Sequence, residues 1–394
     1  MILPKGHVPK DGPILWRRTV LAGLLAVPLR GLVSAFAVAF FRSGQSRAST
    51  GLPDAATCEV PEGMSRRWGA MRRNRVMAAL SKGFGVQYWG ETFTAGHLSA
   101  APHGLLIIET AKTGANAEDH SREVFFSPQE VRRISHEGRR PVLGYLNLAK
   151  IEPYRDYWVE SLAVSGNPKS LGPRDARWIG PSLGKEGTLA RYWTPGWETI
   201  LKDRVDQLLR QGVDGLFLDD VLQYYTYFQG VAAQRAEFST PDGPRSAGEF
   251  ARAMMHLVLS ISNHARGQGC GTLIIVNNGV FIGRDAGEEP GASPSPNTFS
   301  RYRAALDGIL IESVFAAGGD LHAISALQED FASEGVPILT IDFGDADGRS
   351  ADALRADIRH QAQRLGFTPY VADDAAFNRL YPPIPVGPAA SDDP

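Results

Sequence analysis

The sequence predicts a closed β/α barrel in which eight parallel strands alternate with helices. The first observation behind this is a repeated junction, where a helix-like stretch ends at a glycine and an apolar, strand-like stretch follows within a few residues. A glycine just past a helix end adopts the left-handed conformation without steric cost, and an uninterrupted apolar run suits a strand that is covered on both faces. The junction glycines are Gly138, Gly212, Gly269, Gly335 and Gly366.

The second observation is the number of strand-like runs in the main part of the chain. Eight apolar runs alternate with helical patterns, and eight is the strand number of a closed β/α barrel. An open, doubly wound parallel sheet is the alternative that this alternation leaves open. The runs begin at Phe84, Gly104, Pro141, Asp214, Thr272, Asp307, Pro337 and Thr368.

The helices and loops between these runs give the third observation. Ser127 followed by Pro128 predicts a helix that begins with a serine cap, and the stretch from Trp197 to Gly212 predicts a helix directly before the fourth strand. Connections from helix to strand are short, whereas several connections from strand to helix are long. The long loops therefore gather at the carboxyl ends of the strands, where barrel enzymes build their active sites.

The two ends of the 394-residue chain differ in composition from its middle. We expect residues 1–48 to be a signal peptide or a membrane anchor, because Arg17 and Arg18 precede an apolar stretch as in a twin-arginine export signal. We expect residues 49–82 to be a linker and lead-in, residues 83–376 to form the barrel, and residues 377–394 to be a proline-rich tail. The sequence thus predicts a secreted or periplasmic protein that meets a membrane only through an uncleaved anchor.

Composition argues against several classes of partner and cofactor. The formal net charge is -2 and charged residues make up 21% of the chain, so no basic surface predicts binding to nucleic acid. The two cysteines, Cys58 and Cys270, lack the spacing of a metal site or a redox dithiol, and either a disulfide or two free thiols would fit them. We therefore expect neither a metal ion nor another cofactor.

The long loops are rich in aromatic residues. Trp193 is one of four tryptophans after the third predicted strand, and Tyr224 and Tyr225 follow the fourth. Aromatic rings on the polar rim of a cleft are surfaces on which the C–H faces of sugars stack. Packing in the core or anchoring of loops must account for more than half of these rings, but together they predict a cleft that binds carbohydrate.

Two of the predicted strands end in acids at this same face. Asp219 ends the fourth strand and Glu312 ends the sixth, whereas Asp214 and Asp307 open these strands at the opposite, structural face. With about 4.8 Å between strands and a tilt of about 36°, we expect the carboxyl groups of Asp219 and Glu312 to lie about 5–6 Å apart, close to the spacing in retaining glycosidases. The sequence therefore predicts the acid pair of a glycosidase.

Other roles for these acids stay open. An acid at the end of a barrel strand can cap the next helix or pair with an arginine, and such a structural role suits Asp220 better than Asp219. A metal site formed by Asp219, Asp220 and Glu312, with Asn277 and Asn278 as neutral ligands, is a further alternative.

Four segments of the chain together resemble glycoside hydrolase family 114, the barrel enzymes known as endo-α-1,4-polygalactosaminidases. The segments begin at Gly144, Thr188, Val276 and Asp307, and the similar pattern covers most of residues 84–374. The second segment is the specific one, because it places two tryptophans before a helix that leads into a DGxxLD motif. Where the family often has a Gly-Glu pair after the third strand, this chain has Ala149 and Lys150.

The resemblance implies a reaction and a set of site residues. It implies hydrolysis of an α-linked amino-sugar polysaccharide, with Asp219 as nucleophile and Glu312 as general acid and base. A related hydrolase of biofilm polysaccharide and a polysaccharide-binding barrel without turnover are the alternatives. The substrate-binding residues that we expect are Tyr145, Glu152, Arg155, Trp193, Asp220, Tyr224, Tyr225, Asn277 and Asn278.

Overall fold

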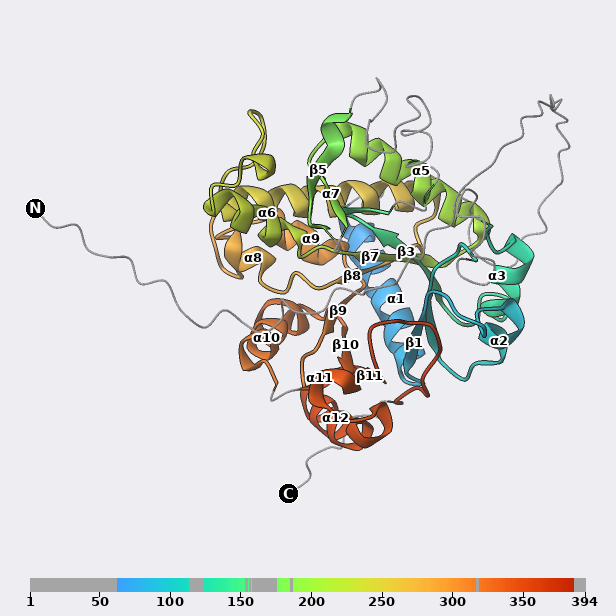
Figure 1. Cartoon of the computed structure of the whole chain (residues 1–394). Helices are drawn as coiled ribbons and strands as arrows, with labels where there is room; N and C mark the ends of the chain where they lie inside the picture. Colours follow the sequence, from blue (N-terminus) through green and yellow to red (C-terminus); the bar gives the residue numbers. More distant parts are fainter. Residues whose placement is uncertain are drawn as a thin grey trace, which may run out of the picture.

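A sheet of eight parallel strands forms the centre of the molecule, and helices surround it (Figure 1). The computed structural model describes residues 62–112, 124–152, 155, 157, 176–184, 187–316 and 319–385. Neighbouring strands follow the order of the chain, and the sequence of pairing is β1-β2-β3-β7-β8-β9-β10-β11. The strands are β1 (Phe84–Gln87), β2 (Leu105–Ile108), β3 (Val142–Asn147), β7 (Gly215–Asp219), β8 (Leu273–Asn277), β9 (Gly308–Glu312), β10 (Ile338–Phe343) and β11 (Thr368–Ala372). All eight fall within the predicted runs.

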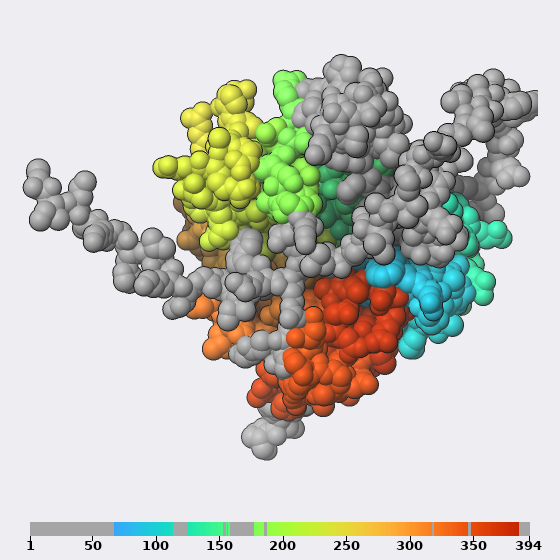
Figure 2. Space-filling model, in the orientation of Figure 1, coloured from blue at the N-terminus to red at the C-terminus, as the bar shows by residue number. Residues whose placement is uncertain are grey.

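The sheet curves until its first and last strands meet. The rings of Phe84 in β1 and Tyr370 in β11 lie 5.4 Å apart between their centroids. In Figure 2 a cyan early segment borders a red late segment at the surface. The molecule is therefore a (β/α)8 barrel, as the alternation of strands and helices predicts, and the open doubly wound sheet is wrong.

Alternate residues of each strand pack on opposite sides of the sheet. In β7, Phe217 belongs to the apolar cluster that fills the barrel interior, whereas Leu216 and Leu218 belong to the cluster that the strands share with the surrounding helices. All three side chains are buried. This division explains why the strands are almost continuously apolar, since both faces of the sheet are covered.

Eleven helices are described around the strands, and most begin and end with local signals. Ser127 caps helix α3 and forms a capping box with Glu130, as its position predicts. Gly212 ends α5 in the left-handed conformation, but Gly269 after α7 is extended at φ -173°, so the prediction for Gly269 is wrong. The helices are α1 (Glu62–Leu80), α2 (Ala95–Ala100), α3 (Pro128–Ile134), α5 (Pro195–Gln211), α6 (Gln223–Ala232), α7 (Ala247–Gln268), α8 (Ile282–Asp285), α9 (Thr298–Ala305), α10 (Leu321–Ala326), α11 (Gly344–Asp347) and α12 (Ala351–Leu365).

Helix α1 closes the amino-terminal end of the barrel. Val76 and Leu80 pack into the cluster that fills the barrel interior. Arg72 pairs at 3.0 Å with Asp307, a fully buried acid that precedes β9, and Arg266 pairs with the same acid at 2.8 Å. The second half of the stretch expected to be a linker and lead-in is therefore part of the barrel.

The expected carboxyl-terminal tail also begins within the barrel. The ring of Phe377 lies 5.1 Å from that of Tyr88, which follows β1, and 5.9 Å from that of Phe343 at the end of β10. Phe377 thus packs at the carboxyl ends of the strands. The start of the tail therefore helps to build the face that carries the predicted site.

A second, smaller sheet lies in the long connection between β3 and α5. Its three antiparallel strands have the order β4-β6-β5, and the sequence patterns do not predict it. The strands are β4 (Lys150–Ile151), β5 (Ile179–Ser182) and β6 (Thr188–Ala190). Because β4 follows β3 directly, this sheet extends the barrel at its carboxyl-terminal face.

The predicted targeting segment and Cys58 lie outside the described residues. Export, anchoring and the pairing of Cys58 with Cys270 therefore stay predictions. Within the parts of the chain that the structure describes, no helix combines the length and the apolar composition needed to cross a membrane.

Candidate active site

Four polar residues end neighbouring strands at the carboxyl-terminal face of the barrel. Asn147, Asp219, Asn277 and Glu312 are the last residues of β3, β7, β8 and β9. The strand register puts Asn147 beside Asp219 and carries Asn277 alongside the end of β9. Parallel strands of a barrel therefore bring together residues that are up to 165 positions apart in the chain, at the face where this fold places its active sites.

The chain turns in the same way after three of these residues. Asp220, Asn278 and Ser313 follow Asp219, Asn277 and Glu312, and their φ angles are 61°, 61° and 58°. This left-handed backbone is uncommon for residues other than glycine, costs about 1–3 kcal/mol each, and is found most often at functional sites. Strained backbone of the kind found at functional sites therefore follows the polar residues that end β7, β8 and β9.

One amide links the two predicted catalytic acids. The Nδ2 atom of Asn277 donates a hydrogen bond to Asp219 Oδ1 at 2.8 Å and another to Glu312 Oε1 at 2.8 Å. Because both oxygens accept a hydrogen bond from the same nitrogen, the distance between them cannot exceed twice 2.8 Å, which is 5.6 Å. This upper limit is compatible with the roughly 5–5.5 Å between the carboxyl groups of retaining glycosidases.

Asp219 receives two further hydrogen bonds. The backbone N–H of Asp220 donates to Oδ1 at 2.7 Å, and the Tyr145 hydroxyl donates to Oδ2 at 2.9 Å. Asn147 in turn donates to the Tyr145 hydroxyl at 3.0 Å. The structure thus brings Tyr145 to the acid pair as expected, and it adds Asn147, which the sequence analysis did not select.

Asp220 is held in a polar network beside Asp219. Its carboxylate accepts hydrogen bonds from Asn147 at 2.6 Å and from Gln223 at 2.9 Å, and it lies 3.7 Å from the ammonium of Lys150. These contacts agree with the structural role considered for Asp220. They also leave its charge close enough to act on the acid pair.

Both acids of the pair are harder to ionise than ordinary carboxyl groups. Burial, followed by the charges of Asp220 and Glu312, raises the pKa of Asp219 to about 7. Burial also raises the pKa of Glu312, while its hydrogen bond from Asn277 acts in the opposite direction. Near neutral pH the pair can therefore retain a proton, which general acid catalysis needs.

A second group of charges lies just after β2 and just after β4. Arg155 pairs with Glu152 at 2.8 Å and with Glu109 at 2.5 Å, and Glu109 and Arg155 are each 3% exposed. The Glu109 carboxylate also accepts the backbone N–H groups of Thr110 and Ala111. Glu109 ends the second predicted strand just as the acid pair ends two others, so its position was a signal that could have identified it.

Tyr88 connects this group to the acid pair. Its ring lies 4.7 Å from that of Tyr145. Desolvation and the charges of nearby carboxylates raise the pKa of the Tyr88 hydroxyl well above its ordinary value. Those carboxylates are Asp219, Glu312, Glu109 and Glu152. Tyr88 therefore belongs to the site, and its place directly after the first strand was the signal that the sequence analysis passed over.

Asn278 acts on the backbone. Its Oδ1 atom accepts the N–H of Glu312 at 3.3 Å, which fixes the end of β9. Asn278 therefore holds the backbone at Glu312, and the structure shows no contact between its side chain and the Asp219 carboxylate within the described residues.

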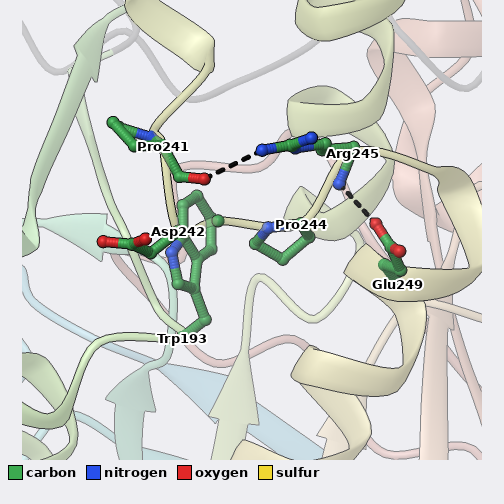
Figure 3. A pocket seen from close by; sticks show the side chains of 7 residues that line it. Trp193, Pro241, Asp242, Pro244, Arg245 and Glu249 are labelled. Atoms are coloured by element: carbon green, nitrogen blue, oxygen red, sulfur yellow. Dashed lines mark hydrogen bonds between the residues drawn. The ribbon is translucent and has the colours of Figure 1, made fainter.

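Trp193 lines a depression at the surface (Figure 3). The depression has a volume of about 550 Å³ and is formed by Trp193 at the junction of β6 and α5 and by residues 241–245 and 249 before and within α7. The Trp193 ring also packs 4.8 Å from Tyr227 and 5.5 Å from Phe250. No contact between Trp193 and the acid pair appears in the described part of the chain, so its binding role stays a prediction.

The two tyrosines of α6 have different environments. Tyr224 is 1% exposed and donates a hydrogen bond to Asp285 at 2.6 Å, so its ring has no open face on which a sugar could stack. This corrects the expectation that Tyr224 lines the cleft. Tyr224 and Tyr227 are three residues apart on the buried face of α6, a spacing that indicates packing. Tyr225 is half-buried and stays a candidate for binding.

The acids do not form a metal site of the usual kind. Among the described residues, no group of three or more His, Cys, Asp or Glu side chains could hold a metal ion. Asp219 and Glu312 instead share an amide donor, which is an arrangement suited to proton transfer and nucleophilic attack.

Comparison with known proteins identifies relatives of this chain. The model of glycoside-hydrolase family GH114 matches residues 109–381. An uncharacterised protein of Thermotoga maritima is 28% identical over 185 residues, which cover 47% of this chain and 49%, about half, of that relative. An uncharacterised protein of Deinococcus radiodurans is 25% identical over 301 residues, which cover 73% of this chain and 80% of that relative.

Two solved structures have a similar course of the chain. The glycoside hydrolase domain of PelA from Pseudomonas aeruginosa is 16% identical, with a TM-score of 0.47, over 75% of this chain and 96% of that one. Aspergillus fumigatus Ega3 in complex with galactosamine is 12% identical, with a TM-score of 0.48, over 77% of this chain and 95% of that one.

Proposed function

Because the chain belongs to glycoside hydrolase family GH114, we propose that it cleaves an α-linked amino-sugar polysaccharide of the polygalactosamine type, with retention of configuration. The observation that supports this most strongly is the position of Asp219 and Glu312 on either side of one amide nitrogen. The short separation favours direct attack by one carboxylate over attack by a water molecule held between the two.

From its hydrogen bonds we propose a role for each carboxylate oxygen. Asp219 Oδ1 already accepts two N–H groups, whereas Oδ2 accepts one hydroxyl and keeps a lone pair. Oδ2 is therefore the oxygen that attacks the anomeric carbon. Glu312 Oε1 accepts from Asn277, so Oε2 carries the proton that passes to the glycosidic oxygen as the bond to the anomeric carbon breaks. Water then gives a proton to Glu312 and displaces Asp219 from the sugar.

The contacts also favour one location for the shared proton. Asp219 accepts hydrogen bonds from three donors and Glu312 from one side-chain donor, and each donor favours the ionised form. When Glu312 is protonated, its charge no longer raises the pKa of Asp219. The arrangement with Asp219 ionised and Glu312 protonated is therefore the favoured one for attack.

The charge of the rim suits an amino sugar. Among the described residues of the rim, acidic side chains outnumber basic ones, and a cleft with one sign of charge attracts ligands of the opposite sign. The acids are Glu109, Glu152, Asp219, Asp220 and Glu312, and the bases are Lys150 and Arg155. A free ammonium group on the sugar would lower the repulsion among these acids.

The release of reducing ends from defined polymers tests the proposed function. We expect the protein to act on partly deacetylated polygalactosamine and to release a product whose first-formed anomer keeps the α configuration, as NMR of the fresh product would show. Asp219→Asn and Glu312→Gln should fold normally and lose this activity. Binding of oligosaccharide without any release of reducing ends, unchanged in Asp219→Asn, would instead support a binding barrel without turnover.

We also propose that residues 1–48 direct the protein out of the cytoplasm. The proposal depends on the paired arginines ahead of an apolar stretch. Replacing Arg17 and Arg18 with lysine should hold the protein in the cytoplasm, as cell fractionation would show. Normal export of this double variant would point to the general secretory route or to a simple anchor.

A further inference from the structure

We propose that Asn277 is the positioning residue of the acid pair: its amide nitrogen fixes the separation of the two carboxyl groups and leaves one oxygen of each open to the substrate. This inference rests on the proposed function, because it takes Asp219 and Glu312 as the catalytic acids.

The first support is the use of both amide hydrogens. An amide nitrogen carries two hydrogens at a fixed angle, and Asn277 directs one to Asp219 and the other to Glu312, each at 2.8 Å. The opposite orientation of the amide would turn its oxygen toward two carboxylates, which is unfavourable. The angle between the two N–H bonds therefore sets how far apart the acids stand.

The second support is that the Asn277 side chain has no hydrogen-bond partner other than the two acids among the described residues. Asn277 is 3% exposed, and its Oδ1 atom is buried without a hydrogen-bond partner in the described part of the protein. The two acids are thus its hydrogen-bond partners among the described residues, so the three side chains hold one another in place. A buried acceptor without a partner destabilises the folded protein, so the favourable contribution of this amide comes from its two donor hydrogens.

The contacts of Asn277 differ from those of Asn147 and Asn278, and they argue against a role of Asn277 in sugar binding. Both of its hydrogens are used within the protein, so none is left for a sugar hydroxyl. Asn278 contacts backbone at the end of β9, and Asn147 accepts the N–H groups of Ala149 and Lys150 in the loop after β3. Among these three asparagines, Asn277 is the one that touches both acids.

The bond from Asn277 can persist through the reaction. It joins Asp219 through Oδ1, while Oδ2 attacks, and it joins Glu312 through Oε1, while Oε2 transfers the proton. The donors also favour the ionised form of each acid. Removal of the amide should therefore both loosen the geometry and make both acids titrate at higher pH.

The test compares Asn277→Leu, which has a similar volume and no donor, with the wild-type protein. The ¹³C signals of the side-chain carboxyls, assigned with Asp219→Asn and Glu312→Gln, report the two titrations, and release of reducing ends reports kcat and KM over pH. We expect both titrations and both limbs of the pH profile to move to higher pH. We expect kcat to fall about 100-fold, as misplacement near 1 Å can cause, with little change in KM.

Asn297→Ala is the matched control. Asn297 caps helix α9 through its bond from the N–H of Ser300, so this variant should lower the melting temperature without moving the titrations or the pH profile. Asn277→Ser, which keeps one donor hydrogen, is the second test variant if Asn277→Leu does not fold, and we expect it to move at least one titration to higher pH.

A folded Asn277→Leu or Asn277→Ser protein whose titrations and kcat match the wild type would overturn the role of Asn277. Full activity in Asp219→Asn would instead overturn the proposed acid pair. The NMR titrations need no substrate, so they test the coupling of the three side chains in either case.

Discussion

Replacing Asp219 with asparagine should stabilise the folded protein at neutral and alkaline pH while it removes activity. The asparagine side chain would have the shape of the aspartate without its charge. Its oxygen can accept the two N–H groups that now reach Oδ1, and its nitrogen can donate to the Tyr145 hydroxyl. The buried repulsion with Asp220 and Glu312 would be lost.

The size and direction of the effect follow from the pKa of Asp219. The pKa of Asp219 is 3.8 ordinarily and about 7 in the folded protein, where Asp219 and Glu312 share the bound proton. Between these values the folded state holds more protons than the unfolded state, so stability falls as the pH rises. About three units at 1.36 kcal/mol each give an upper limit of about 4 kcal/mol. Because part of the repulsion disappears when Glu312 holds a proton, we expect a gain of about 2 kcal/mol for Asp219→Asn above pH 7 relative to pH 4.

Urea and thermal unfolding of both proteins at pH 4 and pH 8 measure this gain. About 2 kcal/mol corresponds to a difference of about 3 °C in melting temperature for a barrel of roughly 300 residues, which unfolds with about 2.1 cal/mol/K of entropy per residue. The control is Asp203→Asn on the exposed side of α5, for which the difference from the wild type should not grow with pH. If Asp219→Asn gained no stability over the wild type between pH 4 and pH 8, the burial of a charge at this position would be refuted.

Three further predictions concern other parts of the barrel. Glu312→Gln should lower kcat by about 10²–10⁴-fold, as loss of a general acid does. The loss should be smallest on a substrate whose leaving group needs no proton, and equal losses on all substrates would contradict this role. Asp307→Asn should destabilise the protein by about 3–5 kcal/mol, measured by urea unfolding, because it removes the charge that pairs with Arg72 and Arg266. KM should stay unchanged, since Asp307 lies at the opposite end of the barrel from the acid pair. Ser313→Gly and its control Gln234→Gly should each relieve left-handed strain of about 1 kcal/mol. Only Ser313→Gly should lower kcat, because the freer backbone of glycine loosens the position of Glu312, and equal activity in both variants would show that a rigid turn after Glu312 is not needed.

Sequence patterns determined the strands and the face that carries the site. Apolar runs, serine caps and junction glycines act over a few residues, so the eight strands and helix α3 could be located without any tertiary contact. Once the strands pair in chain order, Asp219 and Glu312 must end on the same rim with one strand between them. The acid pair was predictable because barrel geometry turns positions in the chain into positions in space.

The tertiary structure alone decided what surrounds this pair. Helix α1 and the region near Phe377 become parts of the barrel through contacts with residues far along the chain, such as Asp307 and Tyr88. Tyr224 turns inward because α6 packs one face against its neighbours. The bond of one amide to both acids depends on side-chain directions at three strand ends, which no local pattern encodes. Local energies thus fix the elements, whereas the packing of distant residues fixes the distances on which the chemistry depends.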